Sequence, residues 1–284
     1  MKNLICSAAK VGSSLKTGLC AALLATGLMV SAQHANAAQW STTEAQIQVG
    51  RLDVPTFAAG GGEQDTFILT LQHASGWKWG DIFFFIDFLS ARSNRQLPFN
   101  IEDAYGEIYF NFSSSKIFGI NYGKGLLKDI GLIQGLNYGA DPNVFKYLPG
   151  IRLSWNLPGF AFLNTDFMAY LDDSGGLGST ATAAPAEDDS WMVDINWAYP
   201  FELVGQKFSI EGHVEYIASR KNELGFTVED WVLAQPQFRW DIGNAVFGEA
   251  NQFFVGIEYQ YWMNKLGDKN TDESAVQALG VWRF

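Results

Sequence analysis

The sequence predicts an all-β fold, a transmembrane antiparallel β-barrel of about 12 strands that follows a cleaved signal peptide. Three observations lead to this prediction. The last residues, 274–284, alternate apolar and polar side chains and end on Phe284. Aromatic residues make up 15% of the chain, although no run of 18 apolar residues follows Ala37. Runs of period-2 alternation recur at lengths of about ten residues, which a tilted strand needs to cross a bilayer.

The final segment has the pattern of a closing barrel strand. Val276, Trp282 and Phe284 share one face of a period-2 element, whereas Gln277 and Arg283 point the other way. Outer-membrane barrels place such an apolar face toward lipid, a polar face toward the lumen and an aromatic residue at the interface. An edge strand of a soluble sheet would alternate in the same way, so the rest of the chain decides between the two.

The N-terminus has the features of a secretory signal. Its basic residues are Lys2, Lys10 and Lys16. A short apolar stretch, 19–30, precedes Ala-Asn-Ala at 35–37, which fits the small-x-small cleavage pattern. The stretch is too short for a transmembrane helix, which needs about 20 residues. We therefore expect a signal peptide at 1–37 and a barrel domain at 38–284.

Cysteine and charge content limit the possible functions. Cys6 and Cys20 both fall in the predicted signal peptide, so the mature chain offers neither a disulfide nor a thiolate metal site. Leu19 is a poor residue before a lipoprotein cysteine. Three of the 19 basic residues leave with the signal, which leaves 16 against 30 acidic residues and a net charge of −14. This balance argues against a nucleic-acid partner.

Alternation predicts twelve strands, an even number as bacterial single-chain barrels require. The predicted strands are about 39–50, 65–74, 80–90, 104–113, 128–138, 145–156, 160–171, 190–198, 207–218, 229–242, 252–264 and 274–284. The fifth is the least regular, because Leu132, Ile133 and Leu136 do not alternate cleanly.

The connections fit a barrel with both ends in the periplasm. The outward connections should be long, and 51–64, 91–103, 172–189 and 219–228 satisfy this. Leu-Pro-Gly at 157–159 predicts a tight turn on the opposite side. The periplasmic connection 114–127 is an exception, because it is too long for a simple turn.

Enzyme motifs are missing, and we expect no catalytic activity, cofactor or metal. The chain after Ala37 has only two histidines, His73 and His213. His213 lies between Glu211 and Glu215 on a predicted lumen face, where a hydrated polar ladder is favoured over a metal site. No local pattern suggests a serine triad, and there is no glycine-rich phosphate loop.

Two neighbouring strands carry aromatic and acidic side chains on one face. A carboxylate is unfavourable against lipid, so the face with the acids should be the lumen. The predicted lining residues are Asp81, Phe83, Phe85, Asp87, Tyr105, Glu107 and Tyr109. One interpretation is a packed barrel interior. The other is a stacking surface flanked by acceptors, which suits a flat heterocycle with sugar hydroxyls.

Three segments carry a resemblance to a known family. Residues 79–88 (WGDIFFFIDF), 105–112 (YGEIYFNF) and 254–259 (FVGIEY) resemble the Tsx-type nucleoside-specific channel-forming outer-membrane proteins. The resemblance implies a twelve-stranded barrel, in agreement with the independent count, with a narrow lumen that passes nucleosides. Some members of the family also serve as bacteriophage receptors. No short invariant signature allows the family's ligand contacts to be placed here.

The sequence thus predicts a Gram-negative outer-membrane channel for passive diffusion of nucleosides or similar small aromatic solutes. Two alternatives stay open. The charge of −14 favours a non-specific or cation-preferring small porin, and the acidic loops favour a surface-recognition barrel that binds phage or host. The expected partners are outer-membrane lipid, nucleosides, bacteriophage and the assembly machinery that would recognise the strand ending in Phe284.

Overall fold

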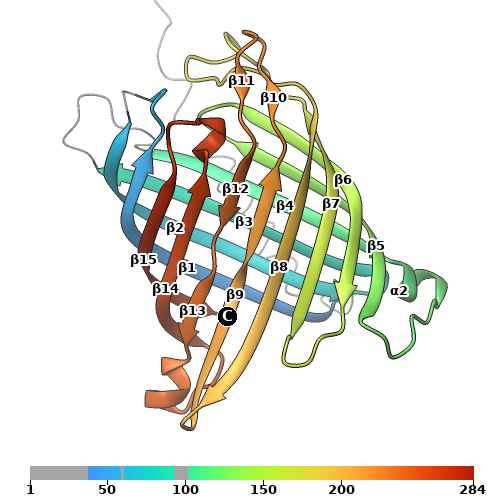
Figure 1. Cartoon of the computed structure of the whole chain (residues 1–284). Coiled ribbons are helices and arrows are strands. Elements are labelled where there is room, and N and C mark those ends of the chain that lie inside the picture. The colour runs from blue at the N-terminus through green and yellow to red at the C-terminus, as the bar shows by residue number, and fades with distance from the viewer. Residues whose placement is uncertain (1–37, 59–60, 93–101) are drawn as a thin grey trace, which may run out of the picture. The chain divides into compact units, whose positions relative to one another are not determined.

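The strands of the computed structural model form one closed antiparallel sheet (Figure 1), and residues 38–58, 61–92 and 102–284 are described. The predicted signal peptide lies outside these residues. The barrel strands are β1 (Ala38–Val54), β2 (Gly62–Trp77), β3 (Gly80–Arg92), β4 (Glu102–Ser113), β5 (Leu127–Gly139), β6 (Val144–Trp155), β7 (Phe162–Asp172), β8 (Ser190–Leu203), β9 (Gln206–Ile217), β12 (Trp231–Ala234), β13 (Gln237–Trp240), β14 (Phe253–Met263) and β15 (Glu273–Arg283). Strand β15 pairs with both β14 and β1, which closes the barrel.

The predicted strand 229–242 is divided into β12 and β13. Pro236 has no N–H to donate to a neighbour, so the ladder stops at 235–236. Both halves keep one register on β9, with Ala234 opposite Val214 and Gln237 opposite Glu211. Counted as one strand, they give the twelve strands that alternation predicts. The first outward connection is shorter than predicted, because β1 and β2 extend to leave only 55–61 between them.

Gly212 makes room for this interruption. It lies on β9 opposite the break, and its backbone φ of 149° is one that residues with a side chain rarely adopt. A Cβ at this position would lie 2.3 Å from the carbonyl oxygen of Gln235. The strand can therefore break at Pro236 only because residue 212 has no side chain.

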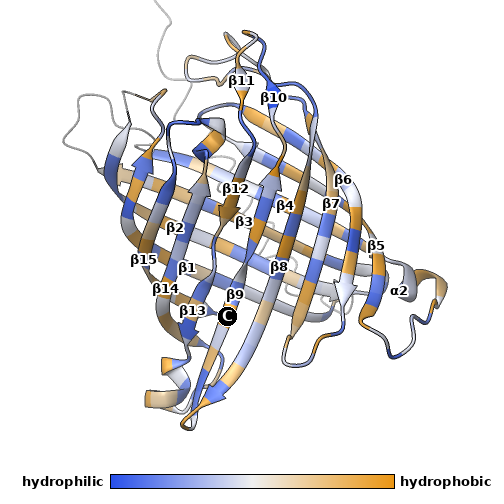
Figure 2. Ribbon diagram, viewed as in Figure 1, coloured by the Kyte–Doolittle hydropathy of each residue, from blue (hydrophilic) through white to orange (hydrophobic). Residues whose placement is uncertain are grey.

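The outside of the barrel is apolar and the inside is polar. The exposed apolar side chains of the strands include Phe67, Leu71, Phe88, Leu132, Ile151, Phe167, Trp191, Ile195, Ile210, Phe238, Ile257 and Val276. Buried polar residues such as Gln46, Arg152 and Gln277 occupy the opposite positions of the alternation, which Figure 2 shows along the strands. A soluble sheet would bury the apolar face instead. The protein is therefore a multi-pass barrel of the bacterial outer membrane.

The two rims of the barrel differ. Two-residue turns at 78–79 and 204–205 lie at one end, and long connections at 173–189 and 218–230 lie at the other. The long connections mark the extracellular end, where β10 (Arg220–Lys221) and β11 (Thr227–Val228) form a small hairpin. Aromatic rings contact one another near the periplasmic end. The ring centroids of Phe201 and Phe208, for example, are 5.6 Å apart. Such a girdle is typical of a membrane interface.

Among the described residues, three short helices lie in the connections. They are α2 (Ser114–Phe118), η2 (Gly243–Phe247) and η3 (Lys265–Gly267). Ser113 caps α2 by accepting a hydrogen bond from Lys116 N at 3.1 Å, and Gly119 ends it with a left-handed φ of 68°. In the described part of the chain, no helix has the length and apolar character to cross a membrane.

Replacing a lipid-facing residue by arginine tests the orientation of the strands. Ile257 is 46% exposed in the middle of β14, so Ile257→Arg should lower the free energy of unfolding in liposomes by about 2–4 kcal/mol. Leu177, 47% exposed in the extracellular connection, is the matched control, and Leu177→Arg should change little. Denaturant titration of both variants measures the difference, and equal costs would contradict the assignment of the outer face.

Candidate functional site

The structure places the seven predicted lining residues side by side on the inner faces of β3 and β4. Phe83 pairs with Tyr109, and Phe85 pairs with Glu107. The centroid of the Phe85 ring lies 6.1 Å from the ring centroids of both Phe83 and Tyr105. All seven side chains are half-buried. The result is a row of rings on the inner wall, with Asp81 at its periplasmic end and Asp87 at its extracellular end.

Glu107 is held between two phenols. The hydroxyl of Tyr105 donates to one carboxylate oxygen at 2.5 Å, and the hydroxyl of Tyr109 donates to the other at 2.8 Å. These contacts fix the carboxylate in the plane of the wall beside the phenylalanine rings. The arrangement offers ring faces together with an oriented acceptor.

A continuous chain of hydrogen bonds runs round the rest of the interior, and we call it the polar belt. Its bonds are between 2.6 and 3.3 Å long. In order, its members are Asp87, Thr70, Gln48, Gln46, Gln237, Glu258, Gln277, Gln260, Gln235, His213, Asp194, Asn196, Asp166, Arg152, Asp81 and Asn111. The belt starts at Asp87 on β3 and returns to Asp81 on the same strand and its partner Asn111 on β4, and Phe83 and Phe85 lie between Asp81 and Asp87.

Two arginines form contacts across the lumen between strands that are not adjacent in the sheet. The guanidinium of Arg152 on β6 donates to both oxygens of Asp166, at 2.8 and 2.6 Å, and to Asp81 on β3 at 3.2 Å. Strands β4 and β5 lie between β3 and β6 in the sheet, so the contact with Asp81 bridges the interior. Nearer the periplasm, Arg239 on β13 reaches Glu44 on β1 at 3.1 Å in the same manner.

Burial inside the barrel is uneven. Gln277 is 0% and Gln46 is 1% exposed on the wall formed by β13–β15 and β1, so that wall is packed tight. Phe83, Phe85 and Glu107 are only half-buried although they face inward. Asn196 on β8 and His213 on β9 also face inward and are half-buried, so the accessible inner surface includes β3 and β4 and continues on β8 and β9.

Four inner carboxylates have no cation beside them. Among the described residues, no lysine, arginine or histidine nitrogen lies within 4.0 Å of Asp87, Glu107, Glu215 or Glu258. Their hydrogen bonds come from neutral groups, such as Thr70 to Asp87 at 2.6 Å. The middle of the barrel thus contains four carboxyl groups that form no ion pair within 4.0 Å with another described residue.

His213 is a member of the belt. Its two ring nitrogens face Asp194 and Gln235, each at 3.0 Å. Its sequence neighbours Glu211 and Glu215 are not its hydrogen-bond partners in these contacts. Within the described ranges, no group of three or more histidine, cysteine, aspartate or glutamate side chains is arranged to hold a metal ion.

An apolar cluster lies on strands β5–β9, β11 and β12. Its buried members are Ile133, Leu148, Met168, Tyr170, Met192, Ile217, Val228 and Trp231. Met192 on β8 pairs with Ile217 on β9. This pair lies two residues closer to the extracellular rim than the pair of Asp194 and Glu215 on the same strands. On these two strands the cluster therefore lies on the extracellular side of the belt.

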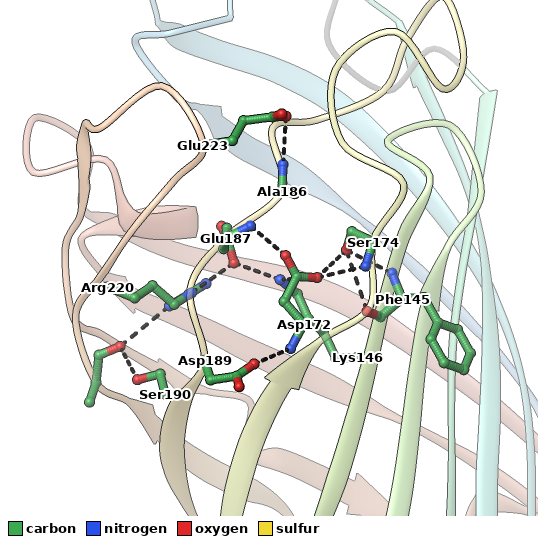
Figure 3. A network of polar contacts seen from close by, with 11 residues as sticks. Phe145, Lys146, Asp172, Ser174, Ala186, Glu187, Asp189, Ser190, Arg220 and Glu223 are labelled. Carbon is green, nitrogen blue, oxygen red and sulfur yellow. Dashed lines mark hydrogen bonds and ion pairs between the residues drawn. The ribbon is translucent and has the colours of Figure 1, made fainter.

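Ion pairs tie the extracellular connections together (Figure 3). Lys146 contacts Asp172 at 3.1 Å and Glu187 at 2.6 Å, and Arg220 contacts Glu187 at 2.7 Å. The Arg220 guanidinium also lies 4.3 Å from the centre of the Trp231 ring, which joins this network to the apolar cluster. The connection 173–189 is thereby fixed to the mouth of the barrel.

Glu223 fixes the outer edge of the same network. The backbone N–H groups of Leu177 and Ala186 donate to its carboxylate at 2.7 and 3.0 Å and lower the pKa of that group. Backbone donors stabilise the charged form of a carboxylate, so the contact holds the two connections together at neutral pH.

The sequence did not single out several members of this interior. Arg152 and Asp166 occupy inward positions of the alternation, which was the one available signal, whereas Gln277 was already placed on the polar face of its strand. Their partners lie on strands distant in sequence, and alternation along one strand carries no information about those partners.

Comparison with solved structures finds other membrane barrels. The NanC porin matches with a TM-score of 0.49 and 13% identity, over 84% of this chain and 98% of that chain. The KdgM porin matches at 0.42 and 10%, over 86% and 99%. The translocator domain of the autotransporter NalP from Neisseria meningitidis matches at 0.40 and 11%, over 95% and 98%. No family model and no curated protein matches the chain. The resemblance to Tsx-type channels stays a prediction, and the fold assignment rests on the strand pairing itself.

Removing the belt's arginine tests the energetic role of the belt. Arg152→Met leaves Asp166, which is 1% exposed, without its cation and should destabilise the barrel by roughly 3–5 kcal/mol. Arg51→Met removes an exposed ion pair with Glu63 and should cost about 0–1 kcal/mol. Denaturant titration in liposomes compares the two variants. Adding Asp166→Asn to Arg152→Met should recover part of the loss, and equal costs for Arg152→Met and Arg51→Met would contradict a structural belt.

Proposed function

We propose that this barrel is an outer-membrane channel for passive diffusion of small solutes, and that its preferred solutes are nucleosides or similar small aromatic molecules. One observation carries the proposal. The half-buried inner faces of β3 and β4 present the rings of Phe83 and Phe85 beside a carboxylate, Glu107, that two tyrosines orient.

The chemistry of this wall matches a nucleoside. A nucleobase stacks on aromatic rings whatever its sequence identity, because every base has a flat π-face. Sugar hydroxyls donate hydrogen bonds, and Asp81, Asp87 and Glu107 supply acceptors along the row of rings. A channel needs several weak sites in succession rather than one tight site, and spaced acceptors provide them.

Single-channel recording tests the proposed stacking. Adenosine or thymidine should reduce the ion conductance in a saturable way, whereas free ribose should not. Phe83→Ala with Phe85→Ala should weaken the block, because each stacked base contributes about 1–3 kcal/mol on aromatic platforms. The open-channel conductance should stay similar or rise, since two inner rings are removed.

Phe88 provides a matched control on the same strand. It faces outward from β3 and is exposed, so Phe88→Ala should leave the nucleoside block unchanged. If millimolar nucleoside leaves the conductance of the unmodified channel unchanged, solute selectivity of this kind is absent.

A cation-preferring small porin is the second candidate function. The four inner carboxylates without a cation partner favour it, because fixed negative charge in a low-dielectric pore raises the local concentration of cations.

The reversal potential in a salt gradient measures this preference. Glu107→Gln and Asp87→Asn should shift the reversal potential toward zero, since each removes fixed charge and keeps the shape of the side chain. Glu249→Gln removes the same charge from an exposed periplasmic position and should have little effect. A reversal potential that ignores all three substitutions would contradict cation preference.

A further inference from the structure

The periplasmic connection between β4 and β5 exposes large apolar side chains away from the strands. Phe118 is 74% exposed, and Ile117, Ile120 and Leu126 are exposed as well. The connection begins with α2 and extends beyond the ends of β4 and β5 (Figure 1). These side chains are not part of the lumen wall, so the proposed channel function does not explain them.

The same segment is basic in an acidic protein. Residues 114–128 contain Lys116, Lys124 and Lys128 and no aspartate or glutamate, although the chain has 30 acidic and 19 basic residues. Lys124 and Lys128 are exposed. Apolar and cationic side chains together, without acids, are typical of an element that lies in the interface of an anionic membrane.

Hydrogen bonds attach this segment to the aromatic girdle. The Lys116 ammonium donates to the carbonyl oxygens of Trp77 and Gly80, each at 3.0 Å. The backbone N–H of Ser113 donates to the carbonyl oxygen of Trp79 at 2.8 Å. Trp79 is itself exposed and lies 5.3 Å from the ring of Trp77. The apolar residues of the connection therefore start at the barrel's own lipid interface.

We propose that residues 114–128 dock onto the periplasmic leaflet as an interfacial anchor for anionic phospholipid. Phe118 and Ile120 enter the boundary between headgroups and acyl chains, and Lys124 and Lys128 pair with lipid phosphates. Lysine suits this position, because its stem lies along apolar surface while its ammonium reaches the headgroups. This anchor is independent of what the channel passes.

A fluorescent label on Phe118→Cys tests the anchor. The full chain is used with Cys6→Ser and Cys20→Ser, refolded into phosphatidylcholine vesicles with or without phosphatidylglycerol. The label should be quenched by lipids carrying a nitroxide near the headgroup and shielded from aqueous iodide. Val204→Cys is the matched control at the same rim, because Val204 is 91% exposed in the β8–β9 turn and should stay open to iodide. Equal iodide access at both positions would overturn the proposal.

The charge component has a separate test. Lys124→Ser with Lys128→Ser should lower the ratio of shielded to open label by roughly fivefold for each lysine in vesicles that contain phosphatidylglycerol. The same variant should behave like the parent in phosphatidylcholine alone. A ratio that does not depend on phosphatidylglycerol would overturn the assignment of anionic lipid. Shielding that rises with protein concentration and persists in detergent micelles would indicate a second copy of the chain and overturn lipid docking.

Discussion

A bilayer offers no hydrogen-bond partner to the protein backbone, and the rest of this structure depends on that constraint. A sheet that crosses the membrane has to close, and β15 closes it by pairing with β14 on one edge and β1 on the other. The bond from Phe284 N to Thr43 O, 2.9 Å long, continues the pairing to the last residue. Because lipid covers the outer face, the polar side chains turn inward and have to satisfy one another.

The diameter of the barrel determines which inward polar side chains can form hydrogen bonds with one another. Eight-stranded barrels are filled by side chains and barrels of 16–18 strands leave an aqueous channel, so twelve strands give an intermediate width. Long side chains can then reach non-adjacent strands, as Arg152 reaches Asp81 and Arg239 reaches Glu44. Replacing Arg152 leaves the carboxylate of Asp166 as an unpaired buried charge, which costs more than the pair contributes. Belt members on distant strands therefore depend on one another, whereas the inner wall of β3 and β4 stays half-buried.

Period-2 alternation predicted the faces of the strands well, because a side chain in a membrane barrel has only lipid or lumen to face. Asp81 and Asp87 marked the inner face of β3 in this way. The partners across the lumen could not be predicted, because strand tilt and shear determine which inner residues share a level, and neither is visible in one strand. Pro236 carried a signal for the interrupted strand, whereas the compensating role of Gly212 depends on the backbone of a neighbouring strand.

The distribution of charge differs between the extracellular mouth and the middle of the barrel. At the extracellular mouth, Asp172 and Glu187 are neutralised by Lys146 and Arg220, which leaves less of the connection 173–189 for the recognition of other partners than its acidic sequence suggests. In the middle of the barrel, Glu107 has no such cation and lies beside Phe85. Stacking and negative potential would therefore act on a solute at the same level. On the proposed function, a neutral or cationic aromatic solute is attracted both by the rings and by the carboxylates. A solute that carries phosphate stacks on the rings but is repelled by the carboxylates. The proposed function therefore implies that the wall favours a nucleoside over its phosphorylated forms.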